Sequence, residues 1–251
     1  MSSAADPFPA WFAALESRHL ERLSFAEVRR GLQALSALYV DRGKRLAAGA
    51  ALEGDGKRAA FALFYAPLHF LLVRDVVRAL GAGGAGPRNI MDLGCGTGAA
   101  AAAWAIESGS RCRVTGVDRS GWAVLEARWN YGALGVRGLA QRGDLSRALL
   151  PGKGGGILAA YTVNELDDAA RESLLQRLLG AARRGAQILV VEPIARRPFP
   201  WWETWSETFR AAGGRDDSWR FTAPLPERLR LLDRAAHLDH RELTGRSLWL
   251  T

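Results

Sequence analysis

Apolar residues recur at helical intervals through residues 6–80, so amphipathic helices are expected there. Ser24-Phe25-Ala26-Glu27 has the form of a capping box, in which serine and glutamate satisfy free backbone N–H groups at a helix start. A second apolar run from Ala59 to Leu80 contains Pro67, which should kink or split it. Residues 1–85 are therefore predicted to form a helical cap whose apolar faces need a partner surface. The face behind the capping box comprises Val28, Leu32, Leu35, Leu38 and Tyr39.

From Asn89 onward the pattern changes to short apolar runs that alternate with helical segments. Such alternation implies right-handed crossovers and a mainly parallel sheet. Residues 242–250 are expected to close the sheet, with an antiparallel direction open. Residues 86–251 are thus predicted to form a doubly wound α/β domain with a seven-stranded, Rossmann-like sheet. The expected strands are 89–93, 113–117, 138–142, 156–161 and 187–192, and the expected helices include 99–107, 121–134 and 168–182.

The strongest chemical signal is a glycine loop between the first expected strand and the next helix. Gly94-Cys95-Gly96-Thr97-Gly98 follows an apolar strand and precedes an alanine-rich helix start. Glycine permits a tight turn and removes the Cβ that would keep a ligand away from the backbone. Free N–H groups at the helix start then face that ligand. Gly94, Cys95, Gly96 and Gly98 are accordingly expected to bind a cofactor.

Aspartates stand at the ends of three successive expected strands. Asp92 lies two positions before the first glycine, where its carboxylate can reach a ligand ammonium directly or through water. Asp118 can accept both ribose hydroxyls of an adenosine. Asp144 can meet the adenine amino group through its carboxylate or backbone. Each aspartate alone is equally well explained as a helix N-cap, but the three together predict a ligand that contains adenosine.

Two adenosine cofactors fit this loop. Gly94-x-Gly96-x-x-Ala99 also satisfies the dinucleotide fingerprint. A pyrophosphate would gain nothing from the charge of Asp92, however, and the Gly-x-Gly-x-Gly spacing is tighter than that fingerprint. A dinucleotide domain also often opens with its motif, whereas here the motif follows the long helical segment. S-adenosylmethionine (SAM) is therefore the predicted cofactor.

Residues 92–98, with Asp118 and Asp144, resemble the class I SAM-dependent methyltransferases over residues 86–251. Residues 159–166, 189–193 and 30–39, the last followed by Tyr65-Ala66-Pro67, are similar to the methyltransferase-like proteins associated with assembly of the mitochondrial small ribosomal subunit, which have bacterial relatives. This resemblance implies RNA or the small ribosomal subunit as a partner. The mitochondrial members carry cysteines suited to an iron–sulfur cluster, which needs about four thiolates. This chain has only Cys95 and Cys112, so no cluster is expected, and Glu192-Pro193-Ile194 stands where Glu-Pro-Gly is typical.

The fourth expected strand ends next to the position of the reactive methyl group, because ligands of such sheets lie at the carboxyl ends of the strands. Tyr161 is expected to contact the cofactor there. Asn164 could orient an amine through its amide oxygen, and Glu165 could accept a proton, although a base is needed only if the acceptor loses its proton early. Tyr161, Asn164 and Glu165 are the candidate catalytic residues. The competing interpretation is that residues 165–168 simply cap the next helix.

Aromatic residues gather after the fifth expected strand. Trp201, Trp205 and Phe209 are spaced as one buried helix face, which leaves Trp202 as the candidate for a surface that stacks on bases or on an aromatic acceptor. His237 and His240 are three residues apart, as metal ligands can be, but no third ligand is evident in the sequence. No metal is assigned.

The net charge of +8 favours a polyanionic partner, and the pair Arg196-Arg197 near the fifth strand suits phosphate. Thirty-one arginines against three lysines also match the codon bias of a GC-rich genome, so the charge alone supports both interpretations. A cytoplasmic location is expected because no secretory signal is recognised and no disulfide or zinc spacing occurs. The most apolar run, Phe61 to Val73, is too short to span a bilayer, so no membrane partner is expected.

Three functions remain open from the sequence. The chain could be a methyltransferase that acts on ribosomal RNA or a ribosomal component. It could be a small-molecule methyltransferase whose helical segment acts as a lid. It could also be a ribosome-assembly factor that binds SAM without turnover, because binding does not prove catalysis.

Overall fold

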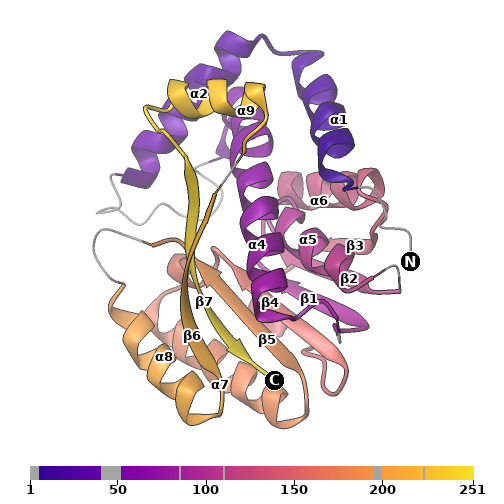
Figure 1. The fold of residues 1–251 in the computed structure, drawn as a ribbon, viewed down its shortest axis with the longest axis vertical. Helices are drawn as coiled ribbons and strands as arrows, with labels where there is room; N and C mark the ends of the chain where they lie inside the picture. Colours follow the sequence, from indigo (N-terminus) through magenta and orange to yellow (C-terminus); the bar gives the residue numbers. More distant parts are fainter. Residues whose placement is uncertain (1–5, 41–51, 85, 110, 195–198, 223) are drawn as a thin grey trace.

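The computed structural model describes residues 6–40, 52–84, 86–109, 111–194, 199–222 and 224–251. The predicted capping box at the start of the second helix is confirmed, since the backbone N of Ser24 donates to Glu27 Oε2 at 2.8 Å and the backbone N of Glu27 donates to Ser24 Oγ at 3.3 Å. The N-terminal elements are α1 (Phe8–Leu20), α2 (Phe25–Val40), α3 (Asp55–Ala60), the π-helical turn η2 (Phe61–Tyr65) and α4 (Ala66–Leu80), as Figure 1 shows.

The apolar face predicted for α2 is buried as far as it can be followed. Val28, Leu32 and Leu35 are fully buried. The side chains of Leu38 and Tyr39 lie outside the described residues.

Pro67 does not split the second helical run, which was one of the two outcomes expected of it. The helix is continuous from Asp55 to Leu80, and Pro67 lies in the first turn of α4, directly after η2. The backbone N of Ala66 donates to the carbonyl of Phe61 five residues back, so the bonding pattern shifts where proline lacks its N–H. At 26 residues the helix is long and apolar enough to cross a membrane, so the expectation based on length was wrong. Its most apolar window is 72% buried inside the protein, as in a core helix.

The sheet has the order β3-β2-β1-β4-β5-β7-β6, with β1 to β5 parallel and β7 antiparallel to both of its neighbours. The predicted α/β class, the five parallel strands and the closing strand are thereby confirmed. Strand β6 was not predicted, because none of its eight residues is buried and no apolar run marks it. The strands are β1 (Asn89–Leu93), β2 (Arg113–Asp118), β3 (Arg137–Arg142), β4 (Gly155–Ala160), β5 (Gln187–Glu192), β6 (Arg215–Thr222) and β7 (Glu242–Leu250).

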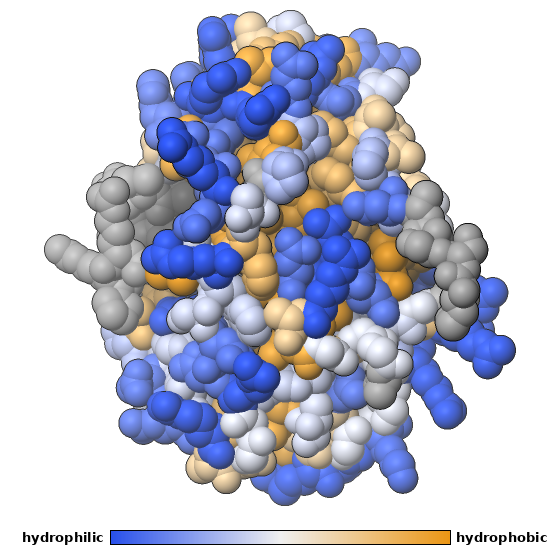
Figure 2. Space-filling view, viewed as in Figure 1, coloured by the Kyte–Doolittle hydropathy of each residue, from blue (hydrophilic) through white to orange (hydrophobic). Residues whose placement is uncertain are grey.

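Helices cover both faces of the sheet (Figure 1). On one face α4 packs beside α5, and on the other the buried residues of α7 and α8 form a second cluster with β4 and β5. Hydrophilic residues cover much of the surface in Figure 2, with apolar residues exposed between them. The remaining elements are α5 (Ala99–Glu107), α6 (Gly121–Ala133), α7 (Asp168–Arg183), α8 (Pro200–Ala211), α9 (Glu227–Ala235) and the 3-10 turns η3 (Leu145–Arg147) and η4 (Val163–Glu165).

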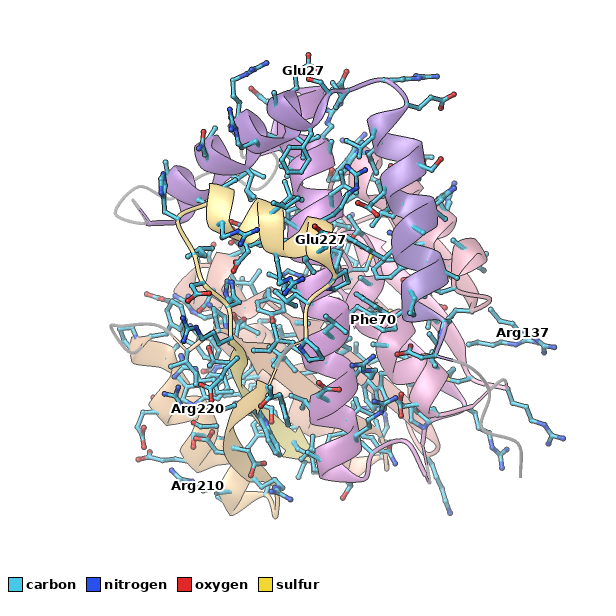
Figure 3. The ribbon with its side chains drawn as sticks, turned by 45° about the horizontal axis from the view of Figure 1, so that its top comes forward. Glu27, Phe70, Arg137, Arg210, Arg220 and Glu227 are labelled. Atoms are coloured by element: carbon cyan, nitrogen blue, oxygen red, sulfur yellow. The ribbon has the colours of Figure 1, made fainter. Side chains whose placement is uncertain are left out.

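The N-terminal helices and the sheet share one hydrophobic cluster. Phe70 of α4 (Figure 3) contacts Phe8 and Trp11 of α1, with ring centroids 5.5 and 5.2 Å apart. Trp11 Nε1 donates to Asn130 Oδ1 at 2.8 Å, and Asn130 Nδ2 donates to the carbonyl of Thr97 at 2.9 Å. The first helix is therefore connected, through one buried asparagine of α6, to the glycine loop.

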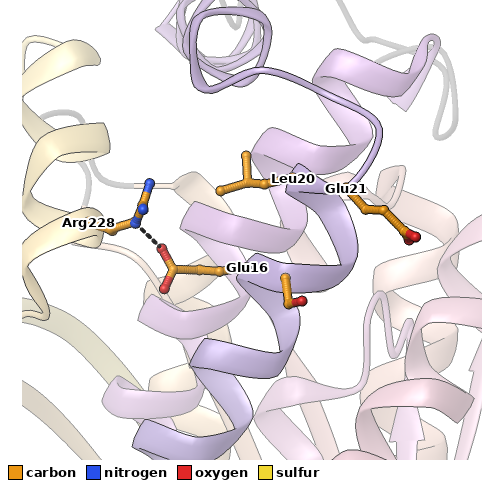
Figure 4. A pocket seen from close by; sticks show the side chains of 5 residues that line it. Glu16, Leu20, Glu21 and Arg228 are labelled. Atoms are coloured by element: carbon orange, nitrogen blue, oxygen red, sulfur yellow. Dashed lines mark ion pairs between the residues drawn. The ribbon is translucent and has the colours of Figure 1, made fainter.

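Helices α1 and α2 also contact α9, which lies near the other end of the sequence. Helix α2 packs on α9, and Gln33 Nε2 donates to the carbonyl of Ala235 at 3.1 Å. Glu16 of α1 and Arg228 of α9 form an ion pair at 3.2 Å across a surface pocket (Figure 4). None of the predicted site residues lines this pocket, so it is separate from the glycine loop.

Candidate active site

The site is built at the carboxyl ends of β1 and β4, where the strand order changes direction. From β1 the chain proceeds to β2 and β3 on one side, and from β4 it proceeds to β5 on the other. Ligands of open α/β sheets bind at such a switch point. Every residue predicted for the cofactor follows or ends one of β1, β2, β3 and β4, so the fold gathers them at one edge of the sheet.

The three glycines of the loop adopt a left-handed backbone, with φ of 68° at Gly94, 50° at Gly96 and 75° at Gly98. A Cβ on Gly94 would stand 2.6 Å from the side chain of Thr162, and one on Gly98 would stand 2.7 Å from the Tyr131 ring. A Cβ on Gly96 would meet no atom within 4 Å. Two glycines are therefore required by packing, and the middle one faces open space.

Asp118 fixes the loop from the adjacent strand. Its Oδ2 accepts from the backbone N of Gly96 at 2.9 Å, and its Oδ1 accepts from the backbone N of Ser120 at 2.8 Å. The backbone N groups of Gly94 and Cys95 donate to the carbonyl of Val117 at 2.9 and 3.0 Å. The end of β2 thus holds the glycine loop in place, while the Asp118 residue stays partly exposed.

A buried polar cluster lies beneath the loop. Asp92 is 2% exposed, and its Oδ2, like the Tyr131 hydroxyl, has no hydrogen-bond partner among the described residues. Burial, with the neighbouring charge of Asp118, raises the pKa of Asp92 to about 8. Burial also raises the pKa of the Cys95 thiol. A carboxyl that is desolvated and half-satisfied in this way stands ready for a ligand that brings positive charge.

Asp144 caps the η3 turn, as the N-cap interpretation expected. Its Oδ1 accepts from the backbone N of Ser146 at 2.8 Å. Its Oδ2 accepts from Arg119 at 2.6 Å. These bonds lower the pKa of Asp144 to about 2, the backbone bond from Ser146 being the first cause. The aspartate is thus ionised at neutral pH and linked to the residue that follows Asp118.

Tyr161 directly follows β4 in a strained conformation, with φ of 58° at a residue other than glycine. Its backbone N donates to the carbonyl of Val191 at 2.8 Å. Its ring stacks on His69 of α4, with centroids 3.8 Å apart and planes 14° from parallel. Burial lowers the pKa of His69 to about 3, which keeps this imidazole neutral, and raises the pKa of Tyr161. Strain of this kind concentrates at functional sites.

Asn164 is held by two neighbours. Its Nδ2 donates to Glu192 Oε2 at 2.5 Å, and its Oδ1 accepts from Trp201 Nε1 at 3.0 Å. Glu192 is fully buried at the end of β5 and accepts through Oε1 from the backbone N groups of Val163 and Asn164. Glu165 is exposed and ends the η4 turn. The predicted trio of Tyr161, Asn164 and Glu165 therefore shares one edge, with Asn164 fixed in orientation.

The alternative interpretation, that residues 165–168 cap the next helix, is confirmed for one of these residues. Asp167 is the N-cap of α7, and its Oδ1 accepts from the backbone N of Ala170 at 2.8 Å. This helix therefore takes its cap from Asp167, not from Glu165.

The buried face expected after β5 is confirmed for Trp205 and Phe209, but the expectation for Trp202 was wrong. Trp202 is 5% exposed, and its Nε1 donates to Asp216 at 3.2 Å while Arg246 lies over its ring. Trp201, assigned to the buried face, is the partly exposed one and reaches Asn164. Trp202 is buried because β6 and β7, which supply Asp216 and Arg246, cover it.

Two further expectations concern basic and metal-binding groups. His240 lies against Asp233 of α9, with Nδ1 and Oδ1 at 2.5 Å. This contact gives the histidine a structural partner. Arg196 and Arg197, considered for phosphate, lie outside the described residues.

His69 and Glu192 were missed as site residues by sequence reasoning. His69 lies on an apolar helix far from the glycine loop in sequence, and no local pattern marks its contact with Tyr161. Glu192 has a detectable signal, because a charged residue ends a strand that is otherwise completely buried.

A family model described as a methyltransferase domain matches residues 90–185, which include the glycine loop, Asp118, Asp144 and Tyr161. No curated protein matches the chain. Among solved structures, the chain is similar to a candidate O-methyltransferase from Nostoc punctiforme, with 15% identity and a TM-score of 0.55 over 93% of this chain and 72% of that one. It is similar to the mitomycin 7-O-methyltransferase MmcR, with 15% identity and a TM-score of 0.55 over 98% and 73%. It is also similar to a candidate class I SAM-dependent methyltransferase from Listeria monocytogenes, with 12% identity and a TM-score of 0.50 over 99% and 89%.

The sheet order, the glycine loop and the matched domain define the class: the chain has the class I SAM-dependent methyltransferase fold. The protein is an enzyme of this class, and SAM is its cofactor.

Proposed function

We propose that SAM lies along Asp92 and the loop of Gly94, Cys95, Gly96 and Gly98, with Asp118 at the ribose and Asp144 at the adenine. The observation that carries this proposal is the orphaned Oδ2 of buried Asp92, which a ligand ammonium or its water would satisfy. The open space at Gly96 supports it, because a ligand can approach that backbone closely. Asp118 keeps acceptor capacity for ribose hydroxyls, since each of its oxygens accepts one backbone hydrogen bond and has a further lone pair.

The methyl group would be delivered beside Tyr161, Asn164 and Glu165. Bound SAM supplies an electrophilic methyl on a sulfonium, so the protein mainly has to align the acceptor and exclude water. Tyr161 contributes a rigid aromatic wall because its backbone and ring are both fixed. Asn164 keeps a defined orientation between Glu192 and Trp201 and offers the remaining lone pair of its Oδ1. Glu165 is the group that takes the proton when the acceptor has one to lose.

The acceptor is a planar ring. A chain of aromatic contacts runs from Trp122 at the start of α6, through Phe61, Tyr65 and His69, to Tyr161 at the end of β4. Its two terminal rings, Trp122 and Tyr161, follow β2 and β4, which carry cofactor residues, and π-helical turns such as η2 occur frequently at functional sites. Aromatic side chains hold nucleobases by stacking.

We take a base of ribosomal RNA, or a ring of a ribosomal component, as the first candidate for that acceptor. The resemblance of residues 159–166 to the ribosome-associated proteins supports it. A cytoplasmic location accompanies this proposal.

A small aromatic molecule is the second candidate, with residues 1–85 as a lid on the domain of residues 86–251. The contact of His69 with Tyr161 favours it, because it brings the N-terminal segment directly onto the site. The mitomycin 7-O-methyltransferase, a structure similar over nearly the whole chain, bears a small-molecule name.

The test is to label a cell extract with SAM that carries a radioactive methyl group and to separate RNA, protein and metabolites. Label in RNA supports the first candidate, and label in metabolites supports the second. The Asp118→Ala variant is the control and should remove the label in every fraction. Absence of label with the wild-type chain, despite measured SAM binding, would favour a ribosome-assembly factor that binds SAM without turnover.

A further inference from the structure

Basic residues gather at the amino ends of the strands of the α/β domain. The carboxyl ends carry both signs of charge, with Asp118 and Asp144 beside Arg119 and Arg142. At the amino ends, the five segments 81–88, 108–113, 134–137, 151–155 and 183–186 contain six arginines and one lysine and no aspartate or glutamate. These seven residues are Arg88, Arg111, Arg113, Arg137, Lys153, Arg183 and Arg184, and we call them the basic row.

Strand pairing places the basic row along one line. Arg113 and Arg137, the first residues of β2 and β3, are direct register partners. Arg88 precedes β1 and accepts through its carbonyl from the backbone N of Arg113 at 3.0 Å. Its own backbone N donates to the carbonyl of Gly154 at 2.9 Å, next to Lys153. A row across five parallel strands spans roughly 19 Å, because neighbouring strands lie about 4.8 Å apart.

At the end of the row that contains Lys153 and Arg184, the two loops are in backbone contact. A Cβ on Gly185 would stand 3.3 Å from Cα of Lys153, and one on Gly152 would stand 3.2 Å from the carbonyl of Arg184. Lys153 and Arg184 are therefore side by side, although they come from different loops.

The charges of the row are available to a partner. All seven residues are exposed, and in the described part of the chain none of their side chains forms an ion pair. The side chain of Arg184 donates to a helix carbonyl, that of Gly180. Arg137 projects away from the sheet in Figure 3. The nearby acid Glu107 is already paired with Arg78 at 2.8 Å. The row carries seven positive charges against a net charge of +8 for the whole chain, so the excess is concentrated on one edge.

We infer that the basic row docks the phosphate backbone of an RNA strand, on the side of the sheet opposite the methyl-transfer site. Arginine forks bind phosphate oxygens in pairs, and a linear array of cations suits a linear array of phosphates. A membrane surface fits less well, because interfacial segments bury large apolar side chains and these loops consist mostly of glycine, alanine and arginine. The inference that this surface binds a polyanion depends only on the observed charges. The choice of RNA over DNA as the partner depends on the proposed function.

The test compares two triple charge reversals with equal change in net charge. Arg113→Glu/Arg137→Glu/Arg184→Glu alters the row. Arg29→Glu/Arg230→Glu/Arg234→Glu is the matched control, since these three residues are exposed on α2 and α9 and form no ion pair among the described residues. Affinity for a fluorescent single-stranded RNA of 20 nucleotides is measured by anisotropy over a series of salt concentrations.

The row variant should lose at least about tenfold in affinity at low salt, and its dependence of log K on log salt should become shallower by about 2, at about 0.7 per lost contact. The control variant should bind like the wild type. Equal weakening of both variants, or no RNA binding by the wild type at low salt, would overturn the inference. Binding to anionic phosphatidylserine vesicles in preference to RNA, abolished by the row variant, would overturn the choice of partner.

Calorimetry with SAM separates this inference from the proposed function. The row variant should bind SAM like the wild type, because the substituted residues lie at the opposite end of the sheet. If the wild type fails to bind SAM along the glycine loop, the proposed site fails while the row can still bind RNA. If SAM binding is intact and RNA binding is absent, only the row is refuted.

Discussion

Replacing Asp92 with asparagine should stabilise the fold and weaken the cofactor at the same time. Asp92 is buried, its Oδ2 has no partner among the described residues, and its pKa is raised to about 8. The ionised form is therefore unfavourable in the ligand-free protein. Asparagine keeps the shape of the side chain and removes the charge.

The sign and size of the expected stability change follow from the difference between the pKa of Asp92 in the folded and in the unfolded protein. An unfolded chain loses the Asp92 proton near 3.8, whereas the folded protein keeps it up to about 8. Stability is therefore lost as pH rises through this window. At about 1.36 kcal/mol per pKa unit, the cost at pH 7 has an upper limit of about 4 kcal/mol. We expect Asp92→Asn to recover at least about 1 kcal/mol at pH 8, which corresponds to a rise in Tm of about 2–4 °C.

The assay is urea unfolding of wild type and Asp92→Asn between pH 5 and pH 8, without ligand. The stability gain should grow as pH rises. Asp55→Asn, whose side chain is 84% exposed, is the matched control and should show no such growth. SAM affinity measured by calorimetry should fall at least about tenfold, since a charge-assisted hydrogen bond contributes roughly 1.5–3 kcal/mol. A variant that is less stable at pH 8, or that gains equally at pH 5 and pH 8, would refute the reasoning.

Three further predictions follow from the same site. Asp118→Ala should weaken SAM at least about tenfold in calorimetry, because the ribose loses a charge-assisted partner and the Gly96 N–H loses its anchor; unchanged affinity in a folded variant would exclude the assignment. Gly94→Ala should lower Tm, because its Cβ would stand 2.6 Å from Thr162 at a φ of 68°, and a wild-type Tm would contradict the packing described. Deletion of residues 1–80 should leave an aggregating or inactive domain, since it removes the core contacts of α1 and α4; a soluble, fully active remainder in gel filtration and activity assays would show that the helical segment is dispensable.

The fold could be predicted from the sequence because its signals are local. Strands β1, β4 and β5 are short apolar runs, and the glycine loop marks the turn from β1 into α5. Strand β6 carries no such signal, since it is an exposed edge strand defined only by its pairing with β7. The wrong assignment of Trp202 follows from that omission, because Asp216 of β6 is the partner that holds it.

The site was predictable to the extent that it follows strand ends. Asp92, Asp118 and the glycines are adjacent in sequence to strands that the apolar pattern reveals. The stacking of His69 on Tyr161 depends on how α4 crosses the sheet, which no pattern within either segment encodes. Glu192 orients Asn164 through a hydrogen bond. Such a role cannot be predicted from the sequence, because it depends on the distance between two segments that are far apart in the chain.

The meeting of α2 with α9, and of Glu16 with Arg228, has a consequence for synthesis on the ribosome. Helices α1 and α2 both contact α9, which comes far later in the chain, and the contact between Gln33 and Ala235 spans 202 positions. Such non-local contacts slow folding, because the chain loses conformational entropy in closing a long loop before the contacts can stabilise the fold. The nascent N-terminal helices therefore expose apolar surface until α9 has left the exit tunnel, which makes this segment a substrate for chaperones during translation.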